Sequence, residues 1–326
     1  MDNKAWFKEA KFGMMVHFGL YSLLAGEWKG KRTDWVAEWI RCTMRIPRAE
    51  YHKLLPAFNP VFFDADEWVT LAKEAGMKYI VVTAKHHEGF CLYKTEVDDF
   101  NCVTGTPFGR DIIGELAEAC KRHGIRLGLY YSQEIDWNEP DGGAYAHGTH
   151  NGCRTNSWDY PDNDAKDFER CFRKKTIPQV RELLNRYGDL LLIWFDTPNI
   201  ITPEQSAELY RLVKELQPNC LVNTRIGNGL GDYTSMDDNE FPDEYMKDGL
   251  YETPATLNGS WGFKYFDENY KAADKVMELK DHLNSRGINY LLNVGPDHLG
   301  RIPAPAQDIL REVGSRINAE AEKQSH

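Results

Sequence analysis

The sequence predicts a single α/β domain built as a (β/α)8-like TIM barrel. Short apolar runs without polar alternation recur along the 326 residues, and each is followed by an amphipathic stretch. Parallel strands covered by helices have this pattern. The chain is long enough for eight such units, and no linker rich in Pro, Gly or Ser divides it. An open doubly wound sheet is the alternative, but GxGxxG is missing from the first strand-to-helix turn, and no phosphate-binding loop of the GxxxxGKS type occurs.

Three strands and three helices are expected in the N-terminal half. The strands are continuous apolar runs, and the helices have apolar residues three and four positions apart. Asp64 is suited to begin one helix as its N-cap, and Gly76 and Gly124 are suited to end two of them. In chain order, the elements are a strand at 11–18, helices at 47–55 and 64–75, a strand at 77–84, a helix at 110–123 and a strand at 125–132.

The C-terminal half repeats the pattern after an irregular segment, 133–164, that is rich in Gly, Asn and Asp. Gly188 is suited to end the first helix of this half. Two weaker strand candidates, at 232–235 and 251–256, would bring the number of strands to eight. The other elements are helices at 166–187, 203–216, 269–285 and 303–317, and strands at 190–195, 221–225 and 289–294.

Charge and composition exclude several classes of partner. The net charge is −11, and the longest basic run is the triplet 173–175, so binding to nucleic acid is not expected. No stretch approaches the length of a membrane span, and the N-terminus does not resemble a signal peptide, so we expect a cytoplasmic protein without a membrane partner. The seven cysteines lack CxxC spacing, which favours a reducing compartment. The oligomeric state is left open.

Polar and titratable side chains follow five of the expected strands directly. The carboxyl ends of parallel strands meet at one rim of a barrel, where catalytic groups lie. An ionised carboxylate after "LLLIWF" is costly to bury unless donors hold it, so Asp196 is the strongest candidate. His86 and His87 are adjacent and would point to opposite sides of an extended strand. The residues at the strand ends are His17, His86 and His87, Tyr130, Asp196 and Arg225.

Seven motifs in order resemble the α-L-fucosidases of glycoside hydrolase family 29 and span residues 5–304. The resemblance implies a (β/α)8-like catalytic domain, and we expect it to form one domain over residues 1–326 without a C-terminal β-sandwich. It further implies a retaining exo-α-L-fucosidase that removes terminal α-L-fucosyl residues from oligosaccharides or glycoconjugates by double displacement. The motifs are "FGMMVHFGLYS", "AEWIRCTM", "KHHEGF", "LGLYYS", "IWFD", "YETPATLNGSWGF" and "NYLLNVGPDHLGRIP".

By position, Asp196 resembles the catalytic nucleophile of this family. Trp194 resembles a residue that lines the sugar site, and Trp261 adds a possible aromatic wall. Fucose has a methyl group in place of a 6-hydroxyl, so its site needs apolar surface as well as hydrogen-bonding groups. The residues that resemble the family's substrate-binding groups are His17, Trp39, His86, His87, Tyr130 and Arg225.

The acid/base of a retaining glycosidase is a second carboxyl group close to the nucleophile. The sequence favours Glu252, because it lies in a well-matched motif and has apolar neighbours that would raise its pKa. The alternatives are Asp237, Asp238 and Glu240. Some family members have Thr-Pro-Glu near this point, whereas this chain reads Ser-Met-Asp at 235–237.

No metal or other cofactor is expected. His147, His150 and Cys153 have a spacing that zinc ligands can have, but the segment is not helical in pattern and lacks a fourth ligand. No GxSxG motif indicates a serine nucleophile. Two rival functions remain: a carbohydrate-binding protein with a fucosidase-like pocket but no turnover, and a retaining glycosidase for a related sugar such as α-L-galactose.

Overall fold

Eight parallel strands form the centre of the fold. The computed structural model describes residues 2–143 and 155–324. The strands follow the chain around the sheet, and the two edge strands are joined by a parallel bridge between Asn223 and Tyr233, so that the sheet closes on itself. This confirms the (β/α)8-like fold. The strands, in order around the sheet, are β7 (Leu221–Val222), β6 (Leu192–Phe195), β5 (Arg126–Tyr131), β4 (Tyr79–Lys85), β1 (Phe12–Val16), β10 (Ile288–Val294), β9 (Tyr251–Thr256) and β8 (Thr234–Ser235).

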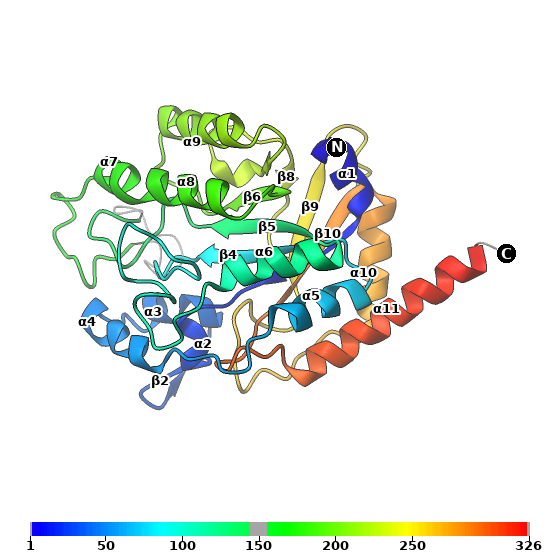
Figure 1. Ribbon diagram of the computed structural model, residues 1–326, viewed down its shortest axis with the longest axis horizontal. Coiled ribbons are helices and arrows are strands. Elements are labelled where there is room, and N and C mark those ends of the chain that lie inside the picture. The colour runs from blue at the N-terminus through cyan, green and yellow to red at the C-terminus, as the bar shows by residue number, and fades with distance from the viewer. Residues whose placement is uncertain (1, 144–154, 325–326) are drawn as a thin grey trace.

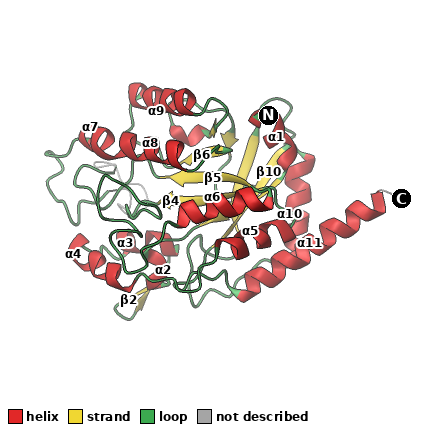
Figure 2. Ribbon diagram, viewed as in Figure 1, coloured by secondary structure: helices red, strands yellow, loops and turns green. Residues whose placement is uncertain are grey.

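Helices surround the strands, as Figure 2 shows. The arrowheads of β4 and β5 point toward the side of the molecule that carries the long loops and the short helices α3 and α4 (Figure 1). The helices are α1 (Asn3–Ala10), α2 (Tyr21–Leu24), α3 (Ile40–Thr43), α4 (Arg48–Tyr51), α5 (Ala65–Glu74), α6 (Ile112–His123), α7 (Phe168–Cys171), α8 (Ile177–Arg186), α9 (Pro203–Leu216), α10 (Ala273–Ser285) and α11 (Ala304–Gln324). The connections from β7 to β8 and from β8 to β9 are fully described and contain no α-helix.

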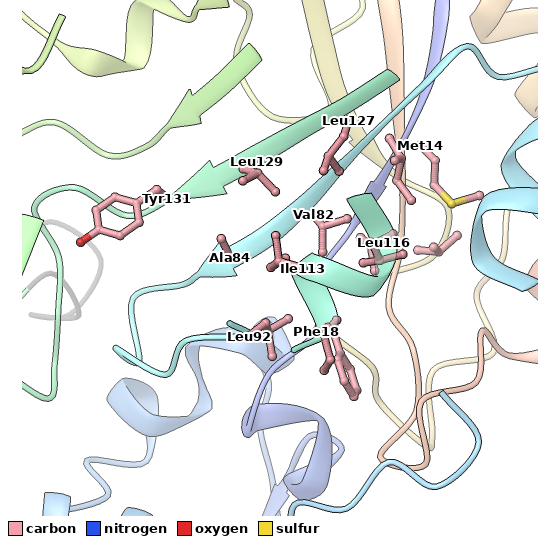
Figure 3. Packing of buried hydrophobic residues seen from close by; sticks show 14 of the residues in the cluster. Met14, Phe18, Val82, Ala84, Leu92, Ile113, Leu116, Leu127, Leu129 and Tyr131 are labelled. Carbon is pink, nitrogen blue, oxygen red and sulfur yellow. The ribbon is translucent and has the colours of Figure 1, made fainter. Parts of the chain in front are cut away.

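The alternating side chains of each strand divide the core into two layers. Figure 3 shows the outer layer, in which Val82 of β4 and Leu129 of β5 lie against Ile113 and Leu116 of α6. The other face of each strand points into the barrel. The interior cluster includes Met15, Tyr79, Val81, Tyr130, Leu192, Trp194 and Leu291.

Helix α1 closes the barrel at the amino ends of the strands. Asp2 caps the helix by accepting the N–H of Lys4, and Phe7 packs against Tyr79 and Tyr233 inside the barrel. The Tyr79 ring fits there because residue 13 is glycine: a Cβ at Gly13 would lie 2.5 Å from the ring. The interior is therefore packed with side chains up to the rim where the long loops begin.

The structure adds detail where the sequence pattern was weak. The expected helix at 47–55 is α4 followed by a 3-10 helix at His52–Ala57, and the helix at 166–187 is α7 and α8 joined by a π-helical segment at Phe172–Thr176. The expected strand 221–225 ends at Val222 and continues as the 3-10 helix Thr224–Ile226. The sequence did not predict α1, α2, α3, the 3-10 helix Ala37–Trp39, or the antiparallel hairpin of β2 (Glu27–Trp28) and β3 (Lys31–Arg32).

No helix in the described residues is long and apolar enough to cross a lipid bilayer. The six cysteines of the described residues are all buried.

Candidate active site

A cavity of about 330 Å³ lies at the carboxyl ends of the strands and collects residues from most of them. Its deep part is formed by side chains that are almost fully buried, and its outer part by residues that are exposed to solvent. The cavity is lined by Met15, His17, Trp35, Val36, Glu38, Trp39, His86, Tyr130, Trp194, Asp196, Thr197, Arg225, Asp237, Asp238 and Trp261. Residues far apart in the chain therefore meet at one site, as the strand-end rule predicts.

Asp196 follows β6 directly and is 9% exposed. Its Oδ2 accepts a hydrogen bond from the Tyr130 hydroxyl at 2.8 Å and lies 3.7 Å from His87 Nε2. Its Oδ1 accepts a hydrogen bond from Arg225 Nη1 at 3.0 Å. Burial alone would raise the pKa of Asp196, but the Arg225 guanidinium, His87 and these hydrogen bonds hold it below its ordinary value. The side chain is thus an ionised carboxylate facing the cavity.

Trp194 forms the floor beside this carboxylate. Its ring stacks on Tyr130 with the centroids 5.5 Å apart, and the Arg225 guanidinium lies 4.7 Å from the ring centroid. The indole N–H donates to Glu252 Oε1 at 3.0 Å. The ring is therefore held by stacking, by a cation–π contact and by a hydrogen bond, which fixes an apolar platform next to Asp196.

Glu252 does not lie on the cavity wall. It is fully buried inside the barrel, where its Oε2 accepts from Tyr79 at 2.5 Å and its Oε1 from Trp194. Burial raises the pKa of Glu252 to about 7, against the opposing effect of these hydrogen bonds. The sequence argument for a raised pKa thus agrees with the structure, but its expectation that Glu252 reaches the sugar does not. The side chain points inward because strand alternation places it on the interior face of β9.

The three predicted histidines lie close together but not in equivalent places. His17 and His86 line the cavity with their ring centroids 5.3 Å apart. Burial lowers the pKa of His17 to about 4, although His17 Nδ1 donates to Asn293 Oδ1 at 2.7 Å, and burial lowers the pKa of His86 well below its usual value. Both are neutral at neutral pH, and because the Nδ1 proton of His17 is used by Asn293, its Nε2 is left to accept a hydrogen bond from a sugar hydroxyl.

His87 lies behind the wall, but not on the opposite side of an extended segment as expected: β4 ends at Lys85, and the rings of His86 and His87 lie side by side with their centroids 4.2 Å apart. The Nδ1 of His87 is 2.6 Å from Ser132 Oγ, and its ring contacts Trp39 and Trp137 edge-on at centroid distances of 4.9 and 5.6 Å. It meets Asp196 from the side away from Arg225. The other two predicted aromatic residues, Trp39 and Trp261, are both part of the cavity wall.

The residues at the end of β4 also include Lys85 and Glu88, which hold neighbouring loops in place. Lys85 is buried, and its Nζ lies 3.0 Å from Asp136 Oδ2, which Lys175 contacts as well, at 3.1 Å. Glu88 accepts from the backbone N–H of Leu20 and from Tyr51, and burial raises the pKa of Glu88 to about 7. These pairs fix the loops around the histidines and do not line the cavity.

Asp237 and Asp238 line the outer part of the cavity, whereas Glu240 does not and instead accepts the backbone N–H of Asp237. Asp238 Oδ1 accepts from Arg225 Nη2 at 2.7 Å, so one guanidinium binds both Asp196 and Asp238. Burial and the charge of Asp196 raise the pKa of Asp238, although Arg225 opposes them. Its side chain is still 48% exposed and open to solvent.

The sequence did not identify Glu38, which lies next to Trp39 on the wall. It is 1% exposed, and its Oε2 accepts the N–H of Gly262 at 2.8 Å. Burial raises the pKa of Glu38 to about 7. The motif "AEWIRCTM" could have identified it, because Glu38 directly precedes Trp39, which the resemblance gives as a substrate-binding residue. Met15, Trp35, Val36 and Thr197 are the other wall residues that the sequence did not predict.

Buried amides and one carboxylate fix the backbone that carries Asp196 and Arg225. Gln133 Oε1 accepts the N–H of Asp196 at 2.8 Å, and its Nε2 donates to the carbonyl of Arg225 at 2.9 Å. Asn223 bonds both the N–H and the carbonyl of Phe195 at 2.9 Å. Glu134 Oε2 accepts three consecutive backbone N–H groups of residues 199–201 at 2.7–2.9 Å. The loop behind Asp196 is thus held by side chains that follow β5 and β7.

In the described residues, no group of three or more His, Cys, Asp or Glu side chains is arranged to hold a metal ion. His147, His150 and Cys153 lie outside the described residues.

Comparisons with known proteins show the family of this chain. A family model described as Alpha-L-fucosidase matches residues 1–322. The chain is 32% identical to tissue alpha-L-fucosidase of Rattus norvegicus over 97% of this chain and 69% of the rat protein. Among solved structures, alpha-L-fucosidase AlfC from Lactobacillus casei in complex with α-L-fucose product is 51% identical, with a TM-score of 0.94 over 99% of this chain and 100% of that chain. Alpha-L-fucosidase from Vibrio sp. strain EJY3 is 36% identical, with a TM-score of 0.91 over 97% of this chain and 55% of that chain. The chain therefore belongs to the α-L-fucosidase family, the glycoside hydrolases of family 29.

Proposed function

We propose that this α-L-fucosidase is a retaining, exo-acting enzyme with Asp196 as nucleophile and Asp238 as acid/base. The observation that carries the proposal is the shared guanidinium of Arg225, which binds an ionised Asp196 through one nitrogen and Asp238 through the other. Retaining glycosidases need two carboxyl groups about 5–5.5 Å apart, and two carboxylates on one guanidinium are suited to such a spacing.

The two carboxyl groups differ in the way that double displacement requires. Asp196 has a lowered pKa and attacks the anomeric carbon as a carboxylate, which forms a covalent fucosyl-enzyme. Asp238 has a raised pKa, so it can donate a proton to the leaving oxygen and then remove one from the attacking water. Arg225 keeps Asp196 ionised and limits the rise in the pKa of Asp238.

The shape of the cavity supports action on a terminal sugar. Its deep part is closed by His17, His86 and Tyr130, all at most 4% exposed, so a chain cannot pass through it. Neutral imidazoles and the Tyr130 hydroxyl supply hydrogen bonds to the fucosyl hydroxyls, and Trp194 and Trp261 supply apolar surface. A variant of the L. casei enzyme has been solved in complex with Fuca(1,6)GlcNAc, and we propose fucosylated oligosaccharides as the substrate class here.

The first experiment is product analysis by proton NMR during hydrolysis of an aryl α-L-fucoside. We expect α-L-fucose to form first and β-L-fucose to appear only by mutarotation. Asp196→Ala should abolish hydrolysis, and azide should restore turnover and give β-L-fucosyl azide. Initial formation of β-L-fucose, or unimpaired activity of Asp196→Ala, would contradict the assignment.

The second experiment separates Asp238 from its neighbours. Asp238→Ala should lose activity about 10²–10⁴-fold on substrates with basic leaving groups and much less on activated aryl substrates, because acid catalysis matters most for basic leaving groups. Azide should then give α-L-fucosyl azide. The same measurements on Asp237→Ala provide the control, and a larger leaving-group dependence in that variant would transfer the role to Asp237. Rates on aryl α-L-galactosides test the related-sugar alternative.

A further inference from the structure

The outer part of the cavity contains a large aromatic side chain that the proposed reaction does not use. Trp35 lines the cavity and is 49% exposed, whereas the deep wall residues are almost completely buried. A single exposed tryptophan on a surface needs no explanation. An exposed tryptophan on the wall of a sugar-binding cavity does, because it offers a large apolar surface to a ligand at the entrance.

The backbone on both sides of Trp35 is anchored to the fold. Before it, Thr33 is buried, its N–H donates to the carbonyl of Gly26 at 2.8 Å, and its Oγ1 accepts the N–H of Trp35 at 3.2 Å. After it, the N–H of Ala37 donates to Ser260 Oγ at 2.9 Å. The backbone that carries the indole is therefore held on both sides, which limits the backbone entropy lost when a ligand binds.

The leaving group of the proposed reaction lies at this same end of the cavity. Asp196 is in the deep part, and Asp238, which protonates the leaving oxygen, is in the exposed part. Trp35 and Asp238 line the same cavity. A fucosyl residue with its anomeric carbon at Asp196 thus directs its aglycone toward the entrance.

We propose that Trp35 forms the aglycone subsite and stacks against a gluco-configured pyranose linked to fucose. A pyranose with equatorial substituents exposes C–H groups on its faces and packs flat against an indole ring. A cavity of about 330 Å³ falls at the lower end of the range of about 300–1,000 Å³ that small-molecule pockets cover. This inference rests on the proposed function, since it takes the direction of the leaving group from the assigned carboxylates.

Equilibrium binding in the Asp196→Ala background tests the subsite without turnover. We expect Trp35→Ala to weaken binding of α-L-fucosyl-(1,6)-N-acetylglucosamine at least 10-fold by titration calorimetry, and to weaken binding of free L-fucose less than 3-fold. Trp35→Phe should recover most of the disaccharide affinity, because it restores an aromatic face. Phe62→Ala, which removes another exposed aromatic ring outside the cavity, is the matched control and should change neither affinity.

The outcomes separate this inference from the proposed function. Equal losses for disaccharide and fucose, or no loss for either, would overturn the aglycone role of Trp35. If the parent enzyme instead gives β-L-fucose as its first product, the retaining mechanism fails, while the difference between the two ligands still reports on Trp35.

Discussion

Glu252→Gln tests whether the buried carboxyl group beneath Trp194 supports the fold or takes part in the reaction. Burial raises the pKa of Glu252 from 4.5 to about 7 in the folded protein. Below pH 4.5 the group is protonated in the folded and the unfolded chain, and its full contribution to stability is present. As the pH rises through the folded pKa, the unfolded chain has already lost the proton and the folded chain still holds it, so the free energy of unfolding falls.

The size of this loss follows from the two pKa values. The difference between 4.5 and about 7 corresponds to about 3 kcal/mol, at about 1.4 kcal/mol per pKa unit. Glutamine does not ionise, so the variant lacks the loss. We therefore expect the free energy of unfolding of Glu252→Gln, relative to the parent enzyme, to rise by about 2–3 kcal/mol between pH 5 and pH 8.

Urea denaturation followed by tryptophan fluorescence, at a series of pH values from 5 to 8, measures this difference. Glu215→Gln removes an exposed carboxylate from α9 and serves as the control. If the free energy of unfolding changes with pH in the same way for the parent and for Glu252→Gln, the pKa of Glu252 is not raised in the folded protein. The variant should also keep activity on substrates with basic leaving groups within about fivefold, whereas a loss of about 10² or more is what a general acid would give.

Three further predictions follow from contacts around the site. Tyr130→Phe removes a hydrogen bond that lowers the pKa of Asp196, so the acidic limb of the pH–kcat/KM profile should move to higher pH and kcat/KM should fall about tenfold; an unmoved limb would contradict this. Gln133→Leu releases the backbone of Asp196 and Arg225 and should lower kcat by more than it raises KM in steady-state kinetics; an increase in KM alone would show that Gln133 positions neither. Gly13→Ala should lower the free energy of unfolding by about 1–3 kcal/mol in urea titrations, because an added Cβ would lie 2.5 Å from an aromatic ring inside the barrel; an unchanged midpoint would show that the ring can move.

The sequence predicted the part of the site that the barrel itself determines. His17, His86, Tyr130 and Asp196 each follow a long apolar run, and such runs are identified by composition alone. Once the strands are parallel and closed, their ends must meet at one rim. Strand alternation did not predict the places of His86 and His87, because β4 ends at Lys85 and the two rings lie side by side with their centroids 4.2 Å apart.

The parts that the sequence did not predict lie on short or irregular elements. Trp35 and Glu38 follow a hairpin whose strands have two residues each, and such elements are too short to show a period. Glu252 was preferred over Asp238 because its motif is better matched, but it lies on a six-residue strand whose alternation turns it inward. Asp238 follows the two-residue strand β8, which gives almost no signal of its own.

The two proposed catalytic carboxylates lie on different kinds of backbone, and only Asp238 lies in a connection without an α-helix. Asp196 directly follows β6, and its backbone N–H is bonded by Gln133, whereas Asp238 follows β8 in a connection that contains no α-helix of its own. Insertions and substitutions between 236 and 250 can therefore alter the angle and reach of the proton donor while the covalent step keeps its geometry. Variant libraries confined to this stretch are therefore a way to change which aglycones the enzyme accepts while Asp196 and its hydrogen bonds stay unchanged.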